Sequence, residues 1–141
     1  MARTATAEWK GDLMGGGGRV ALGSGAYEGT YSFATRFEDK PGANPEELLG
    51  AANAGCFSMA LANSLAKAGH VATSVKTTAH VHLGKDDKGF LITRIDLVCD
   101  AEVPGVDEAT FQEHARNAKT GCIISRALAA TEITLAATLR S

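Results

Sequence analysis

Apolar and polar residues alternate along several short segments near the N-terminus, which is the pattern of strands with one buried face. These segments cover residues 4–9, 20–22 and 31–37, and four glycines at 15–18 separate the first two. The glycines lack the following Lys-Ser/Thr pair of a phosphate-binding loop, so they indicate a flexible hairpin connection. The pattern predicts an N-terminal β-meander.

A long helix is predicted to begin at Asn44. Asn44 is a favourable N-cap, Pro45 suits the first helical position, and Glu47 is placed to complete a capping box. Gly69 provides the stop signal. Because no charged residue lies between Glu47 and Lys67, the helix is apolar nearly all round and requires an apolar environment.

Polar and small residues within this helix favour protein over membrane as that environment. Asn53, Ser58, Asn63 and Ser64, together with many alanines, make a poor membrane span. A helix of roughly 24 residues is about 36 Å long. A domain of this size does not easily cover such a helix alone, which points to a second subunit.

The second half of the chain is predicted to hold a hairpin, two shorter helices and a closing strand. The segments are 74–83 and 91–103 for the hairpin, 107–118 and 122–128 for the helices, and 133–139 for the last strand. Turn-forming residues at 84–89 connect the hairpin. The order β-β-β-α-β-β-α-α-β, with strands linked mainly as hairpins, predicts an α+β fold in a single domain over residues 1–141.

Composition and charge narrow the function classes. The chain has 141 residues, is 45% hydrophobic and carries a formal net charge of −2, with its 14 Lys and Arg spread along the sequence. Nucleic-acid binding is therefore not expected. The N-terminus lacks the pattern of a secretory signal, so we expect a cytoplasmic protein. Its three cysteines should then be thiols used for packing, metal binding or redox chemistry.

The three cysteines differ in their surroundings. Cys99 lies on the apolar side of its strand and is interpreted as a small core residue. Cys56 lies in the middle of the long helix, away from free N–H groups, so a reactive Cys56 needs a cation supplied by the tertiary structure. Cys122 lies at a helix start, where backbone N–H groups favour a thiolate, and function and packing are equally good readings. Because 122 − 56 = 66 residues separate them, only the fold can bring these two together.

A metal site is the alternative that His80 and His82 suggest. They project from one face of a strand, two residues apart. A third ligand is not evident, and metal sites need three or four. A solvated strand face is the better interpretation, and neither a metal nor a cofactor is expected.

Four sequence blocks resemble a known family: TRFE at 35–38, NPEELLGAANAGCFSMAL at 44–61, AKTGCIISRAL at 118–128 and EITLAATL at 132–139. Over essentially its whole length the chain resembles the OsmC and organic-hydroperoxide-resistance family, in its osmotically inducible protein C branch. The resemblance implies an OsmC-like fold, in which long central helices are wrapped by antiparallel sheets in an intertwined homodimer. It also implies reduction of organic hydroperoxides, and of hydrogen peroxide less well, with an external dithiol reductant of lipoyl type.

The same resemblance assigns the catalytic residues. Cys56 matches the reactive cysteine, Cys122 the resolving cysteine, Arg36 the thiol-activating arginine and Glu47 the glutamate that orients it. Arg19 is a second candidate for the arginine, because the organic-hydroperoxide branch takes it from that earlier region.

Two features qualify this assignment. Nine residues of helix place Glu47 about 13.5 Å from Cys56 and on the opposite side, so Glu47 should serve the thiol of the other subunit. Family members usually carry proline directly after the second cysteine, where this chain has Ile123; the change affects how readily Cys122 reaches its partner.

The expected chemistry follows from thiol reactivity. A Cys56 thiolate attacks the peroxide, giving an alcohol and a sulfenic acid, and Cys122 condenses with the sulfenic acid to a disulfide. The alternative is a non-catalytic dimeric binding or stress-response module in which both cysteines are structural.

Overall fold

The computed structural model describes residues 1–140. The residues group into two compact units, Met1–Leu48 and the chain from Leu49 onward, and each unit is described by itself. One helix, over Pro45–Lys67, continues through the division. That the chain forms a single domain stays a prediction.

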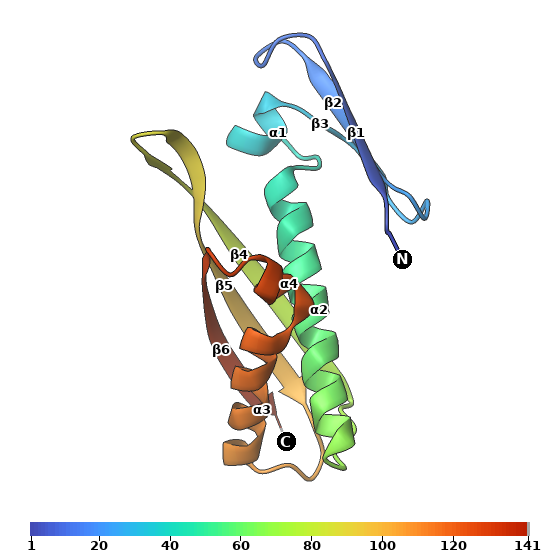
Figure 1. Ribbon diagram of the computed structural model, residues 1–141, viewed down its shortest axis with the longest axis vertical. Coiled ribbons are helices and arrows are strands. Elements are labelled where there is room, and N and C mark those ends of the chain that lie inside the picture. The colour runs from blue at the N-terminus through green and yellow to red at the C-terminus, as the bar shows by residue number, and fades with distance from the viewer. Residues whose placement is uncertain (141) are drawn as a thin grey trace. The chain divides into compact units, whose positions relative to one another are not determined.

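The N-terminal unit contains the predicted meander. Its strands are β1 (Ala5–Lys10), β2 (Gly17–Leu22) and β3 (Glu28–Tyr31), paired antiparallel in the order β1-β2-β3 (Figure 1). Gly18 of the glycine run belongs to β2, where a Cβ would come 2.5 Å from the Tyr31 ring and 2.9 Å from the Trp9 ring. This part of the run therefore makes room for an aromatic pair and is not only a flexible connection.

The strand predicted over 31–37 is wrong beyond its first residue. Tyr31 ends β3, and Phe33–Phe37 form a short helix, α1. Ser32 caps this helix: its Oγ accepts from the Thr35 N–H at 3.2 Å, and Thr35 Oγ1 accepts from the Ser32 N–H at 2.8 Å. This reciprocal capping box satisfies backbone donors locally, so the helical turn prevails over the apolar alternation.

The long helix α2 begins as predicted. It spans Pro45–Lys67, and the Glu47 N–H donates to the Asn44 side-chain oxygen at 2.7 Å. By length and composition α2 could cross a membrane. Phe57, Leu61 and Leu65 on one face of α2 are fully buried within the protein.

The remaining elements form a second sheet with helices packed on one face. They are β4 (Ser74–Asp86), β5 (Gly89–Glu102), α3 (Glu108–Gly121), α4 (Ile123–Ala127) and β6 (Glu132–Arg140). The sheet order is β4-β5-β6, with β4 antiparallel and β6 parallel to β5. The α+β class is confirmed. The sheets are expected to be antiparallel, and the β5–β6 pair differs in being parallel, because α3 and α4 carry the chain back across the sheet.

The core of this unit lies between β5 and the helices α2 and α3, which cover the same face of the sheet (Figure 1). Ile95, Leu97, Cys99 and Ala101 project from alternate positions of β5 and are at most 1% exposed. The prediction that Cys99 is a core residue is thus confirmed. The opposite face of α2 is uncovered in the single chain, with Met59 76% exposed.

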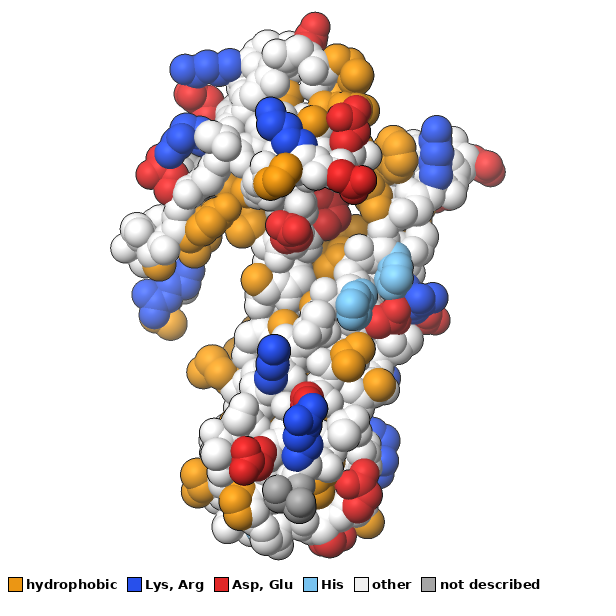
Figure 2. Space-filling view, turned by 180° about the vertical axis from the view of Figure 1, so that it is seen from behind, with side chains coloured by type: hydrophobic (Ala, Val, Ile, Leu, Met, Phe, Trp, Pro, Cys, Tyr) orange, Lys and Arg blue, Asp and Glu red, His pale blue; other side chains and the backbone are white. Residues whose placement is uncertain are grey.

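Charged side chains of both signs are interspersed over the molecular face shown in Figure 2. Elsewhere in the structure, ion pairs such as Arg19–Glu28 and Arg140–Asp100 join side chains of opposite charge. On this face the basic residues do not gather into a patch of one sign.

Candidate active site

The structure brings Cys56 and Cys122 together. Cys56 lies half-buried in the middle of α2, and Cys122 is 2% exposed at the junction between α3 and α4. Both are free thiols, and they lie close enough for Cys122 to raise the pKa of Cys56 and for Cys56 to lower the pKa of Cys122. Two residues that are remote in sequence thus form a dithiol pair.

Cys122 is surrounded by hydrogen-bond donors. Its Sγ is the N-cap of α4 and accepts from the Ser125 N–H at 3.3 Å, and it lies 3.2 Å from Ser125 Oγ. Burial raises the pKa of Cys122, but hydrogen bonds from Ser125, Cys56 and the Ile124 backbone outweigh burial and lower the pKa below its ordinary value. The thiolate of Cys122 is therefore stabilised despite its burial.

The pKa of Cys56 is shifted in the opposite direction, above its ordinary value. Burial raises the pKa of Cys56, and hydrogen bonding and charge from Cys122 raise it further. Backbone N–H groups of Ile124 and Ile123 act against this shift and lower the pKa, but not enough to reverse it. Both sulfurs thus meet the first turn of α4, whose N–H groups have no partners within the helix. Cys56 still needs a cation to become a thiolate at neutral pH, as its mid-helix position predicts.

Asn53 is a site residue that the sequence analysis missed. It is 0% exposed, and its Nδ2 donates to Ser125 Oγ at 3.1 Å and lies 3.9 Å from Cys122 Sγ. Its Oδ1 is buried without a hydrogen-bond partner among the described residues. The signal was present in the sequence: Asn53, Phe57, Leu61 and Leu65 follow one another at helical spacing, so a polar side chain lies on the core face of α2.

Arg36 is held by a glutamate, but not by the expected one. Arg36 Nε lies 3.0 Å and 3.2 Å from the two carboxylate oxygens of Glu46, and Nη2 lies 2.8 Å from Oε1. Glu46 is 9% exposed, whereas Glu47 is exposed. The assignment of Glu47 as the carboxylate that orients Arg36 is thus corrected to Glu46. Glu46 lies on the inward side of the helix, and the neighbouring Glu47 is rotated by about 100° away from it.

The second candidate arginine is engaged elsewhere. Arg19 binds Glu28 through Nη2 at 2.6 Å and Nε at 3.0 Å, and both side chains are 58% exposed. This pair joins β2 to β3 on the surface of the meander. Its geometry is that of a solvated cross-strand ion pair.

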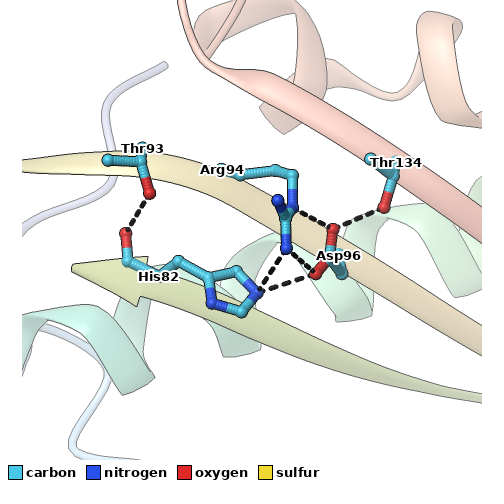
Figure 3. A network of polar contacts seen from close by, with 5 residues as sticks. All are labelled: His82, Thr93, Arg94, Asp96 and Thr134. Atoms are coloured by element: carbon cyan, nitrogen blue, oxygen red, sulfur yellow. Dashed lines mark hydrogen bonds and ion pairs between the residues drawn. The ribbon is translucent and has the colours of Figure 1, made fainter. Parts of the chain in front are cut away.

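His82 takes part in a polar network on the outer face of the second sheet (Figure 3). Its Nε2 lies 2.7 Å from Asp96 Oδ2, and Arg94 and Thr134 bind the same carboxylate. The Arg94 guanidinium, with Thr134 and His82, holds the pKa of Asp96 far below its usual range. Over residues 1–140 the structure contains no group of three His, Cys, Asp or Glu side chains arranged to hold a metal ion.

Sequence comparisons with known proteins all relate this chain to OsmC proteins. The model of the family described as "OsmC-like protein" matches residues 37–137. The chain is 50% identical over 136 residues to "Peroxiredoxin OsmC" of Escherichia coli (strain K12), covering 96% of this chain and 94% of the relative. The relative of the same name from Shigella flexneri matches equally well.

Solved structures show the same fold. An OsmC-like protein of unknown function from Vibrio cholerae superposes with a TM-score of 0.79 at 18% identity, over 98% of this chain and 99% of the other. The organic hydroperoxide resistance protein OhrB of Bacillus subtilis gives 0.74 at 24% identity, over 96% and 98%. At these identities the likeness concerns the fold alone.

Proposed function

The chain belongs to the OsmC-like protein family, and from this premise we propose that it is a thiol peroxidase that reduces organic hydroperoxides through Cys56 and Cys122. The assignment to the peroxidase class agrees with relatives named peroxiredoxin at 50% identity. The observation that carries the mechanism is the pairing of these two thiols at the first turn of α4.

In the first step the Cys56 thiolate attacks the terminal oxygen of the hydroperoxide, and the O–O bond breaks. The sulfur takes up one oxygen as a sulfenic acid, and the other oxygen leaves, with a proton, as the alcohol. Cys56 is the better candidate for this step because it is half-buried, whereas Cys122 is 2% exposed. The exposed side chain of Ile123 beside the pair favours alkyl or aryl hydroperoxides over hydrogen peroxide.

The second step joins the two sulfurs. Cys122 attacks the sulfenic sulfur of Cys56, a disulfide forms, and the hydroxyl leaves as water after taking up a proton. An external dithiol then restores both thiols and is itself oxidised by two electrons. A lipoyl-type dithiol is the reductant that the family resemblance suggests, and no metal or organic cofactor takes part.

Activation of Cys56 is assigned to Arg36. A guanidinium stays charged when desolvated and stabilises a thiolate beside it. The bidentate contact with Glu46 fixes the orientation of this guanidinium. Glu46 thus takes the place of Glu47 as the residue that positions Arg36. The proposed site then consists of Glu46, Arg36, Cys56 and Cys122.

Helix geometry supports a homodimer. Glu46 precedes Cys56 by 56 − 46 = 10 residues, which is about 15 Å along a straight helix. We infer that the Arg36–Glu46 pair of one copy serves the Cys56 of the other. The uncovered face of α2, with Ala51, Ala52 and Met59 exposed, gives the second copy an apolar surface to bury.

A cytoplasmic location fits this proposal because a reducing compartment keeps both thiols available. A membrane or a nucleic acid has no part in it. The rival function is a dimeric binding or stress-response module in which the same cysteines only pack.

Thiol titration separates the two functions. After one equivalent of cumene hydroperoxide, the peroxidase should lose two thiols rapidly and form a Cys56–Cys122 disulfide, while Cys99→Ala should behave like the wild type. Cys56→Ser should lose the rapid phase. If all thiols of the wild-type protein survive the treatment, the protein is a binding module and not a peroxidase.

A further inference from the structure

The hydrogen bonds around Cys122 are directional. An amide nitrogen can only donate, so Asn53 Nδ2 occupies an acceptor position on Ser125 Oγ. When Cys122 is a thiol, its S–H donates to the same hydroxyl oxygen, at 3.2 Å. When Cys122 is ionised, the hydroxyl hydrogen of Ser125 is free to turn to the sulfur. Asn53 therefore sets Ser125 to serve as a donor to a Cys122 thiolate.

The three side chains are shielded from solvent. Asn53 is 0%, Cys122 2% and Ser125 7% exposed. In such a dry setting a hydrogen bond to a charged sulfur is stronger than in water. A buried amide whose Oδ1 has no partner costs stability, which argues for a role of Asn53 beyond packing.

The two sulfurs of the disulfide that the proposed function requires would then be unequal. Thiol–disulfide exchange is faster when the departing sulfur is stabilised as a thiolate, and it also requires access to the attacked sulfur. Cys122 has the stabilising donors, and Cys56 is the more accessible sulfur. Both factors select the same direction of attack.

We infer that Asn53 and Ser125 are positioning residues that make Cys122 the departing sulfur, so that the external dithiol attacks Cys56. This inference rests on the proposed function. One thiolate of the dithiol bonds to Cys56 Sγ, and the Cys56–Cys122 bond breaks with its electron pair on Cys122. The second thiol of the reductant, after losing its proton, then displaces Cys56, leaving the reductant as a cyclic disulfide. Two electrons have passed to the protein, and two protons complete the balance.

The direction of attack can be mapped on the wild-type protein. Oxidised protein is treated with glutathione as a monothiol probe, the released protein thiol is captured at once with N-ethylmaleimide, and the two labels are located by peptide mass spectrometry. Glutathione is expected on Cys56 and maleimide on Cys122. The reverse distribution, or an equal one, overturns the inference.

Substitution at Ser125 tests the donor role separately from access. Ser125→Ala should slow release of Cys122 by glutathione roughly three- to tenfold and should displace the pH profile of disulfide formation to higher pH. Ser125→Thr retains the hydroxyl and should restore both. Asn53→Ala should resemble Ser125→Ala, while Asn63→Ala, at an exposed asparagine of the same helix, should resemble the wild type.

The outcomes also separate this inference from the proposed function. If the wild type does not form the disulfide with cumene hydroperoxide, the proposed function fails. If the disulfide forms but Ser125→Ala leaves the pH profile and the release rate unchanged, only the positioning role fails. Should Ser125→Ala not fold, Asn53→Ala and the label map of the wild type still decide.

Discussion

The guanidinium of Arg36 binds the carboxylate of Glu46, with Nη2 2.8 Å from Oε1 and Nε within 3.2 Å of both oxygens. Neighbouring carboxylates in one helix turn thus have different roles, because Glu46 is almost fully buried and Glu47 is exposed. A bidentate pair of this kind holds the charged group in one orientation.

Glu46→Gln should therefore reduce peroxidase activity more than Glu47→Gln. Loss of the bidentate contact lets Arg36 move, and misplacement of an activating group costs roughly 10- to 100-fold in kcat/KM. The measurement is steady-state reduction of cumene hydroperoxide by both variants, with Arg36→Lys as the reference for a retained charge in the wrong geometry. A larger loss in Glu47→Gln would restore the original assignment.

Ile123→Pro should make Cys56 less reactive. Proline has no N–H, and the Ile123 N–H is one of the backbone groups that lower the pKa of Cys56. The pKa should rise, and the rate of Cys56 alkylation by iodoacetamide at neutral pH should fall roughly three- to tenfold. The measurement uses a Cys99→Ala, Cys122→Ala background, and Ile123→Ala, which keeps the N–H, is the control. Equal rates in the proline and alanine variants would show that this N–H contributes nothing.

Met59→Glu should weaken self-association. Met59 is 76% exposed on the uncovered face of α2, and a carboxylate cannot be buried there without a large desolvation cost. Sedimentation velocity over a range of protein concentrations should show a dimer for the wild type and a shift toward monomer for the variant. Ala66→Glu, at the exposed end of the same helix, introduces the same charge and is the matched control. A wild-type protein that remains monomeric at all concentrations would contradict the two-subunit site.

Asp96→Asn should lower stability at neutral pH but not in strong acid. The Arg94 guanidinium, with Thr134 and His82, depresses the pKa of Asp96 in the folded protein below its ordinary value of 3.8. The ionised group therefore stabilises the fold above that value, and this contribution disappears as the pH falls through the lower, folded-state pKa. Urea midpoints of wild type and variant should differ at pH 7 and converge in acid. A difference that persists unchanged in acid would assign the effect to packing.

The sequence predicts elements well where local signals agree. Asn44 and Pro45 define the start of α2, and strict alternation defines β4 and β5, because cap chemistry and side-chain periodicity are local properties. It fails at Phe33–Phe37, where a capping box prevails over alternation. It also fails for the parallel pairing of β6, because periodicity carries no information on strand direction.

In the candidate site, too, local residue chemistry could be predicted from the sequence, but the packing of the elements could not. Cysteine chemistry and family resemblance identify Cys56 and Cys122, but their proximity depends on how α2 packs against the α3–α4 junction. The choice between Glu46 and Glu47 depends on which side of the helix faces inward, which a single capping motif does not decide. Asn53 could have been found, because a polar residue at a core position of a helix requires a partner.

Cys122 ends one helix and starts the next: its N–H donates to Ala118 O, and its sulfur accepts from the Ser125 N–H. A disulfide sulfur is uncharged and is a poorer hydrogen-bond acceptor than a thiolate. Oxidation would therefore weaken the hydrogen bond from the Ser125 N–H that caps α4, and reduction would restore it. The first turn of α4 would therefore open more often in the oxidised protein than in the reduced one. Faster hydrogen exchange of the Ser125 amide in the oxidised protein would reveal this difference.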